Sequence, residues 1–197
     1  MSLTNLYGDV EVAEPRAMRA LAHPVRLAIL SRLQRYGPST ASRLSPEVGA
    51  TPSVASWHLR HLASFGLVRD AAEGQDGRER WWEAAGRGFR FAAPDDPHDI
   101  EGQAAYRALT EQMFLQYDHL PRLWLAQVEP DLPPRWRRLS GLSNTRVVVG
   151  ARELAAIEKG IEALLAPYVR RDPDDAPRGS RSVRVMRYVM PDAHEGR

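Results

Sequence analysis

Proline and glycine residues divide the first third of the chain into short helices, and this punctuation constrains the fold more than any other feature. Pro24 suits the first turn of a helix, where its missing N–H is not needed, and Gly37-Pro38 ends that helix. Thr51-Pro52 starts a later helix in the same way, and Gly66 ends it. The pattern predicts a series of short helices, the last of them at residues 52–64.

A still shorter helix and a hairpin complete this region. The stretch STASRLSPEVG is predicted to be a short helix that Ser39 or Thr40 can cap. After the helix at 52–64, LVRDAAEG and RERWWEA have the composition of two short strands around a glycine-rich turn. A short helix, a tight turn and a longer helix form a helix-turn-helix, and a hairpin behind them is a wing.

A long amphipathic pattern follows in the second half of the chain. Apolar residues recur every three or four positions from Tyr106 to Val128 and form a continuous seam, as in a long helix. Pro121 should kink this helix, and VEPDLPPRW should end it. We expect a second copy of the chain to cover the seam in a dimer; the alternative is burial against the rest of its own chain.

The C-terminal segment has the pattern of a small strand–helix–strand unit. Residues 145–150 and 182–190 are predicted strands on either side of a helix at 151–168. Their order favours a parallel crossover, although the polar loop at 172–180 also allows antiparallel pairing. The expected fold class is α+β, mainly α. The expected division of the chain is a flexible tail at 1–15, a winged helix-turn-helix domain at 16–90, a linker at 91–101, and a long dimerisation helix with a C-terminal α/β dimerisation or effector unit at 102–197.

The helix at 52–64 has one face suited to DNA. On a helical wheel Ala55, Leu59 and Leu62 define a core face. Small hydroxyls, one arginine and one tryptophan cluster opposite, with Ser56 at the edge of a group made of Ser53, Trp57, Arg60 and Ser64. Arginine can bond guanine bidentately in a major groove, and hydroxyls can approach bases or phosphates. The wheel therefore predicts a recognition helix.

The same helix carries two histidines three positions apart, a spacing that can also hold a metal. His61 falls close to the reading face of the wheel, and His58 falls on the flank of the core. Zinc needs four ligands, or three and a water, and the adjoining sequence supplies no Cys, Asp or Glu. We therefore favour DNA contact or structural support for these histidines over a metal site.

Basic residues surround this helix although the net charge of the whole chain is only +2. Between residues 16 and 66 arginines face a single acid, Glu47, which is typical of a segment with a polyanion partner. In the wing strand, alternation places Arg78, Arg80 and Trp82 on one face, near phosphate or the minor groove. The alternative is that these charges simply face solvent.

Several motifs in order resemble the ArsR-type winged-helix transcription regulators. The chain carries Leu-x-x-Pro-x-Arg-x-x-Ile-Leu at residues 21–30, Ser-x-x-Ser-x-His-Leu-x-x-Leu at 53–62, and Gly-Leu-Val at 66–68. The resemblance covers residues 16–90 and implies that Ser53, Ser56 and His58 belong to a DNA surface. The C-terminal half looks like the extra domain of longer regulators of this superfamily.

The chain departs from the metal-sensing branch of that family. It has no cysteine, which excludes thiolate sensing, disulfides and thiolate metal sites. The Asp and His zinc sites of dimer helices are not clearly matched either, because His119 is the only histidine on the long helix. We expect no cofactor, and a zinc-responsive regulator is retained only as an alternative.

The sequence therefore favours a DNA-binding transcription regulator. Its expected partners are double-stranded DNA and a second copy of itself as a homodimer, and an unknown small-molecule effector is left open as a third. A winged helix that binds protein is the other alternative, whereas catalytic motifs are absent and no enzyme is expected. No membrane span or secretory leader is recognised, so a cytoplasmic location is expected. The predicted DNA-contacting residues are Arg26, Thr40, Arg43, Thr51, Ser53, Ser56, Trp57, His58, Arg60, His61, Arg78 and Arg80, and the arginines Arg26, Arg43, Arg78 and Arg80 are expected to contact phosphates.

Overall fold

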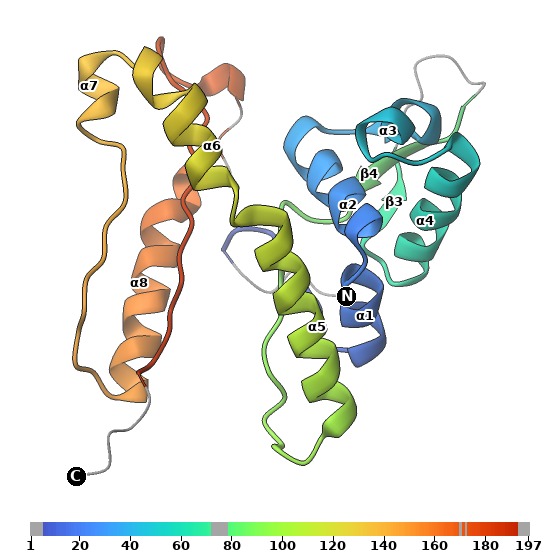
Figure 1. Ribbon diagram of the computed structural model, residues 1–197, viewed down its shortest axis with the longest axis horizontal. Helices are drawn as coiled ribbons and strands as arrows, with labels where there is room; N and C mark the ends of the chain where they lie inside the picture. The colour runs from blue at the N-terminus through green and yellow to red at the C-terminus, as the bar shows by residue number, and fades with distance from the viewer. Residues whose placement is uncertain (1–5, 72–78, 170, 172, 193–197) are drawn as a thin grey trace.

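The computed structural model describes residues 6–71, 79–169, 171 and 173–192. Its N-terminal unit holds four short helices: α1 (Pro15–Leu21), α2 (Pro24–Tyr36), α3 (Ala41–Glu47) and α4 (Pro52–Ser64). Figure 1 shows them gathered around a small sheet, with α3 and α4 following one another across a tight turn. The predicted series of short helices and the mainly helical α+β class are both confirmed.

Local capping explains where these helices begin and end. The Thr51 hydroxyl accepts a hydrogen bond from the Val54 N–H at the start of α4, and Pro52 follows at the first helical position. Gly37 and Gly66 lie just beyond α2 and α4 with φ of 78° and 66°. Such positive φ values are open to glycine at little cost, so these residues end the helices as predicted.

The wing is part of a three-stranded antiparallel sheet. Strand β4 (Trp81–Ala84) lies between β2 (Ser39–Thr40) and β3 (Val68–Asp70), with Asp70 opposite Trp82 in the register. The predicted strands around the turn are thus confirmed, while residues 72–78 lie outside the described chain. Strand β2 was not predicted, because the sequence reasoning assigned its two residues only to capping.

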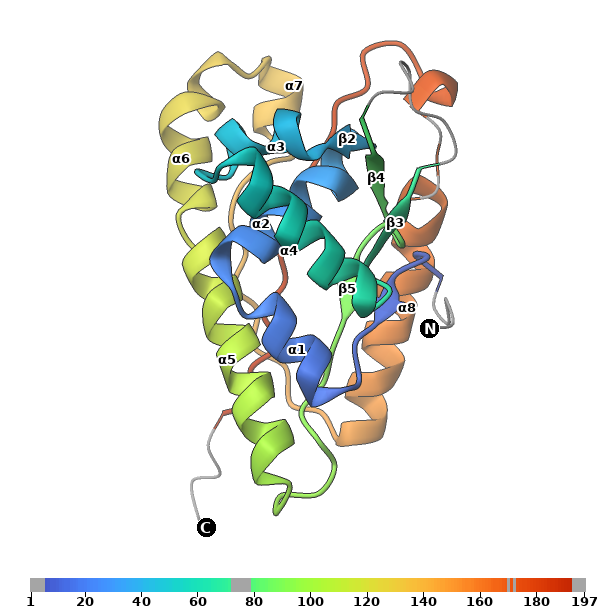
Figure 2. The same ribbon diagram turned by 90° about the vertical axis from the view of Figure 1, so that its right-hand side faces the viewer.

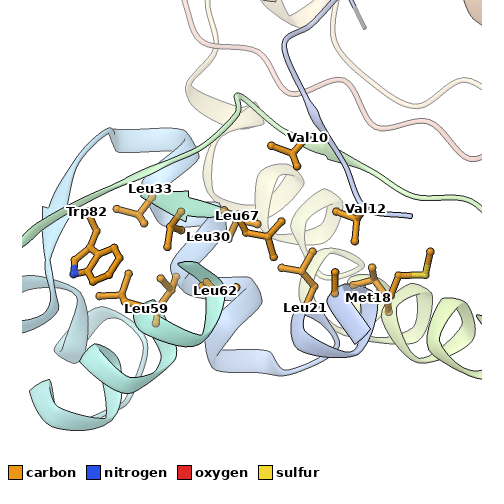
Figure 3. Close-up of a cluster of buried hydrophobic side chains, with 14 of the residues drawn as sticks. Val10, Val12, Met18, Leu21, Leu30, Leu33, Leu59, Leu62, Leu67 and Trp82 are labelled. Atoms are coloured by element: carbon orange, nitrogen blue, oxygen red, sulfur yellow. The ribbon is translucent and has the colours of Figure 1, made fainter. Parts of the chain in front are cut away.

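One apolar core joins these elements. Figure 3 shows side chains of α1, α2, α4 and the sheet meeting in a single cluster, from Trp82 and Leu59 at one end to Met18 at the other. Leu21, Leu30 and Leu62 lie between them and are fully or almost fully buried. Burial of such side chains contributes about 1.5–3 kcal/mol each, so this cluster fixes how α4 is held.

A loose tail was predicted for residues 1–15, and its described part, residues 6–15, is ordered against the sheet instead, while residues 1–5 lie outside the described chain. Strand β1 (Val10–Glu11) pairs in parallel with β5 (Phe89–Arg90), and the Val12 N–H donates to the Arg90 carbonyl at 2.8 Å. Val10 and Val12 are buried in the core. The prediction was wrong because the partner strand lies almost 80 residues away, so no local turn signal marks the pairing.

The predicted long helix is two helices, α5 (Ile100–Tyr117) and α6 (Leu120–Gln127). The break falls just before Pro121, as expected for a residue that cannot continue a helical hydrogen-bond ladder. The first part of the seam is covered by the same chain, since α5 packs on α1 and buries Ala105 and Leu109. The part on α6 has no buried residue.

The C-terminal unit continues with a short 3-10 helix η1 (Glu129–Asp131), α7 (Pro134–Arg137), the long α8 (Ala151–Val169) and η2 (Pro173–Asp175). The helix expected at 151–168 is confirmed. The two strands expected at 145–150 and 182–190 were wrong, because neither segment has a ladder partner in the described chain. In the described part of the chain no helix is long and apolar enough to cross a membrane.

Polar contacts attach this unit to the N-terminal one. Figure 2 shows α8 beside the β5 end of the N-terminal unit and α5 on its other side. Arg90 forms ion pairs with Asp9 at 3.0 Å and with Glu162 of α8 at 2.9 Å. Arg87 donates to the Val169 carbonyl at 2.6 Å. The residues predicted as a linker, 91–101, run from β5 into the first turn of α5.

Candidate nucleic-acid interface

Helix α4 presents the polar face that the wheel predicted. Ala55, Leu59 and Leu62 are fully buried beneath it. On the opposite side, all four side chains of the predicted cluster are exposed: Ser53, Trp57, Arg60 and Ser64. Figure 2 shows α4 across the front of the unit, with no other described element over it. This face is therefore open to a macromolecular partner.

Hydrogen bonds between neighbouring side chains organise the polar row. Arg60 donates from Nη1 to the Ser56 hydroxyl at 2.7 Å, one helical turn away. The Thr51 and Ser53 hydroxyls lie 3.1 Å apart at the start of the helix. Arg60 is thus held along the helix surface, but its remaining guanidinium N–H groups are able to bond an acceptor on a partner.

Trp57 is the large aromatic side chain of this face and is 52% exposed. Its ring stacks on His61 at 5.5 Å between centroids, with 9° between the planes, and meets His58 edge-on at 4.9 Å. His61 in turn contacts Phe65 at 5.3 Å. The exposed indole is therefore supported from below by a row of rings, which fixes its position for contact with a flat partner.

His58 lies beneath the surface rather than on it. It is only 4% exposed, and its ring lies 4.8 Å from that of His23 at the start of α2. Burial, followed by the neighbouring His23 and Arg26, lowers the pKa of His58 and favours the neutral ring. The wheel position on the core flank is confirmed, whereas the DNA surface implied by the family resemblance does not reach this side chain.

Arg26 has a different environment from the phosphate contact that was predicted. It is 9% exposed, and its guanidinium bonds the carbonyl of Ala20 and, at 3.4 Å, that of Arg19. These carbonyls lie in the last turn of α1, which lacks intrahelical partners for them. The prediction failed because the sequence does not show that this side chain folds back on the preceding helix.

The Thr40 side chain is also buried and hydrogen-bonded inside the domain. Its side chain is 1% exposed, and its hydroxyl accepts from the Arg43 N–H at the start of α3. The capping role is confirmed, but burial removes Thr40 from the surface that a duplex could touch. Thr51 caps α4 in the same way and remains exposed.

The wing places two of the predicted basic residues at the surface. Arg80 pairs with Asp70 across the hairpin and lies 4.1 Å above the Trp82 ring. Arg43 of α3 lies 4.7 Å above the Trp81 ring. Arg78 lies outside the described residues. Arg43 and Arg80 are thus exposed cations supported by aromatic rings at the base of the wing.

Two residues near this surface were missed. Val54 is 43% exposed on α4, next to the polar row, and its wheel position beside His61 would have shown it. Ser42 of α3 donates to the Glu79 carboxylate at 2.6 Å. No sequence signal links Ser42 to Glu79, because their contact depends on how the wing packs against α3.

The described residues were also compared with the ligand sets that hold metal ions. No group of three or more His, Cys, Asp or Glu side chains there is arranged to hold a metal ion. His23, His58 and His61 form an aromatic row beside the cationic Arg26. A neighbouring positive charge disfavours a bound cation, so this row supports α4 mechanically.

Part of this geometry, from α2 to β3, is matched by a known domain. Residues 21–71 match the family model described as a helix-turn-helix domain. Within that range α3 and α4 are the two helices of the motif, and the sheet that contains β3 and β4 forms the wing behind them. Among curated proteins no match is found.

Several solved structures align with part of the chain at low overall similarity. One is the homodimeric winged helix-turn-helix DNA-binding domain of a possible ArsR-family transcriptional regulator from Mycobacterium bovis, with 25% identity, 53% of this chain and 79% of that chain covered, and a TM-score of 0.33. Another is a possible transcriptional regulator for arsenical resistance, with 28% identity, 57% and 96% coverage, and a TM-score of 0.31. A transcriptional regulator homologue from Pyrococcus horikoshii has 24% identity, 53% and 93% coverage, and a TM-score of 0.32.

Proposed function

We propose that the chain is an ArsR-type transcription regulator that binds a near-palindromic operator as a homodimer. One observation carries this proposal: α4 of the helix-turn-helix displays Ser53, Trp57 and Arg60 on an open face above a fully buried Leu59 and Leu62. An exposed tryptophan beside an arginine and small hydroxyls suits a major groove, where guanine offers two acceptors and thymine a methyl group. The protein acts without catalysis in this proposal.

The surrounding charges divide into base-reading and positioning groups. Arg60 lies in the middle of the open face and is the candidate for guanine. Arg43 and Arg80 lie at the base of the wing and are candidates for phosphate, a sequence-independent contact. Arg78 lies outside the described residues and remains a candidate because it is two positions from Arg80 in the sequence. Arg26 is excluded from this set by its burial.

The homodimer is proposed to form through apolar side chains of α5 and α6 that lie outside the seam and that the chain itself leaves exposed. Leu115 at the end of α5 is 68% exposed and Leu125 of α6 is 60% exposed. A second copy would cover both and set two α4 helices about one helical turn apart, ~34 Å on B-form DNA. Two half-sites read in this way make an operator with two-fold symmetry.

The first experiment selects bound sequences from a random duplex pool and compares Arg60→Ala with Arg43→Ala. Arg60→Ala is expected to relax the preference at one base pair in each half-site, by about 1–3 kcal/mol. Arg43→Ala should weaken binding to all sequences alike and reduce the salt dependence by about one unit of slope. Equal behaviour of the two variants, or wild-type binding that is insensitive to salt, would reject the proposal.

The dimer is tested separately by sedimentation of Leu115→Glu and Leu125→Glu. Both side chains are exposed within one chain, so the fold of the monomer should survive the change. We expect monomers that protect single half-sites with reduced affinity. Arg122→Glu is the matched control, because Arg122 is exposed on α6 like Leu125, and this variant should remain dimeric. Intact dimers of both leucine variants would place the interface elsewhere.

A further inference from the structure

A cavity of about 190 Å³ lies between α2 and the junction of α5 and α6. Its lining comes from three parts of the chain: Arg32 and Tyr36 of α2, Tyr117 and Leu120 at the junction, and Arg184 of the C-terminal segment. Its volume is below the ~300–1,000 Å³ typical of pockets for drug-sized ligands, so it has room for a single small ring. It is separate from the exposed face of α4.

The cavity carries more positive charge than its neighbours neutralise. Arg32 donates from Nε to Glu47 at 2.7 Å, but its Nη1 is buried and has no acceptor among the described residues. Arg35 and Arg184 also line the cavity, and neither forms an ion pair within the described chain. Guanidinium groups without an ion-pair partner on a cavity wall favour an anionic ligand there.

Aromatic rings occupy the rest of the wall. Arg32 and Arg35 lie 4.8 and 4.9 Å from the centroid of the Tyr36 ring, and Arg184 lies 5.6 Å from that of Tyr117. The Tyr117 hydroxyl is 2.7 Å from that of Ser31, which holds this ring against α2. The lining thus combines these cations with aromatic and aliphatic carbon of Tyr36, Tyr117 and Leu120, which suits a ligand that carries a flat apolar body beside its charge, whereas inorganic anions need no such surface.

We propose that this cavity binds a small aryl carboxylate, with the carboxylate at the arginines and the ring against the tyrosines. Guanidinium groups match a carboxylate in bidentate geometry, and Arg35 and Arg184 are the two lining arginines without an ion pair in the described chain. The ligand would join α2 of the winged helix-turn-helix domain to the C-terminal segment at Arg184. Its use as an effector rests on the proposed function, but binding itself is independent of DNA.

The test is calorimetric titration of the full chain with benzoate in the absence of DNA. Benzamide has the same shape without the charge, and inorganic phosphate has charge without the ring. We expect benzoate to bind at one site per chain and both comparison molecules to bind at least tenfold more weakly, because each lacks one of the two features that the cavity recognises. Equal binding of phosphate or benzamide would overturn the assignment.

Two arginine variants locate the site. Arg35→Gln and Arg184→Gln alter exposed side chains, and each should reduce the benzoate affinity about tenfold while leaving the thermal midpoint unchanged. Arg122→Gln, an exposed arginine of α6 outside the cavity lining, is the control and should bind as the wild type does. No benzoate binding to the wild type, or equal losses in all three variants, would refute the site. A wild-type chain that binds benzoate but not DNA would support the benzoate site and reject only the proposed function.

Discussion

The two halves of the molecule differ in how they bury apolar side chains. The N-terminal unit gathers its leucines and valines around Leu21, Leu30 and Leu62 in one continuous core. Beyond Leu109, only Leu132 and Ala166 are buried among the apolar residues that the structure describes. The N-terminal unit therefore has the core of an independent domain, whereas the C-terminal unit has helices without one.

Polar contacts hold the C-terminal unit in place instead. Glu162 of α8 pairs with Arg90, and Glu158 pairs with Arg187. Exposed ion pairs contribute only about 0–1 kcal/mol each, far less than a buried leucine. Val148 is 100% exposed in a segment with strong strand propensity. The difference teaches that the exposed polar face of α4 lies on the part of the chain that has its own apolar core, while the second part leaves much of its apolar surface exposed.

The largest expected effect is on the free energy of unfolding, and it is measured with one leucine-to-alanine substitution in each half of the chain. Leu59→Ala removes a fully buried side chain under the recognition face of α4 and should reduce the free energy of unfolding by about 2–5 kcal/mol. Leu164→Ala removes a side chain of α8 that is 70% exposed and should change it by less than about 0.5 kcal/mol. Urea denaturation followed by circular dichroism measures both.

Equal losses in these two variants would break the comparison. They would mean that α8 is covered in solution, for example by a second copy of the chain. In that case the loss for Leu164→Ala should depend on protein concentration, because dimerisation adds to stability by mass action. A loss independent of concentration would instead indicate that the C-terminal unit packs on its own chain.

The same contrast explains what the sequence could predict. Helices α2 and α4 were located correctly because Pro24, Thr51-Pro52 and Gly66 act on the residues next to them. The two faces of α4 follow from its periodicity alone, so its exposed cluster and buried leucines were also foreseen. Local signals are sufficient where local geometry decides the structure.

Other features depend on distant partners and could not be predicted. The valines at 145–150 and 182–190 have strand propensity, but a strand also needs a neighbour for its backbone groups, and neither segment has one in the described chain. Val10 and Val12 do find such a neighbour, at β5. Arg26 was assigned to phosphate from its charge, whereas its reach to the end of α1 appears only in three dimensions.

The next effect concerns Arg26, which distinguishes a structural cation from a DNA contact. Arg26→Ala leaves the carbonyls of Ala20 and Arg19 without their donor and should reduce the free energy of unfolding by about 1–3 kcal/mol. Arg16→Ala, an exposed arginine of α1, should have little effect. Where Arg26→Ala is still folded, its affinity for DNA should equal that of the wild type. A loss of DNA affinity without loss of stability would restore the phosphate role.

The smallest effect is a dependence on pH that belongs to the N-terminal unit alone. Burial and the nearby Arg26 lower the pKa of both His58 and His23, so the folded chain resists their protonation. The unfolded chain has histidines near pKa 6.5 and takes up these protons first as the pH falls. The stability contributed by the neutral rings is therefore complete above about pH 6.5 and is lost progressively below it.

Replacement of both rings isolates this contribution from the carboxylates that titrate at lower pH. The free energy of unfolding of the wild type should fall more steeply between about pH 7 and pH 5.5 than that of a His23→Gln, His58→Gln double variant, because only the wild type must protonate these two rings on unfolding. His58→Gln alone should show an intermediate slope. If the double variant kept the full slope, the pH dependence would come from other groups, and the row of rings under Trp57 would be a packing device without a role in titration.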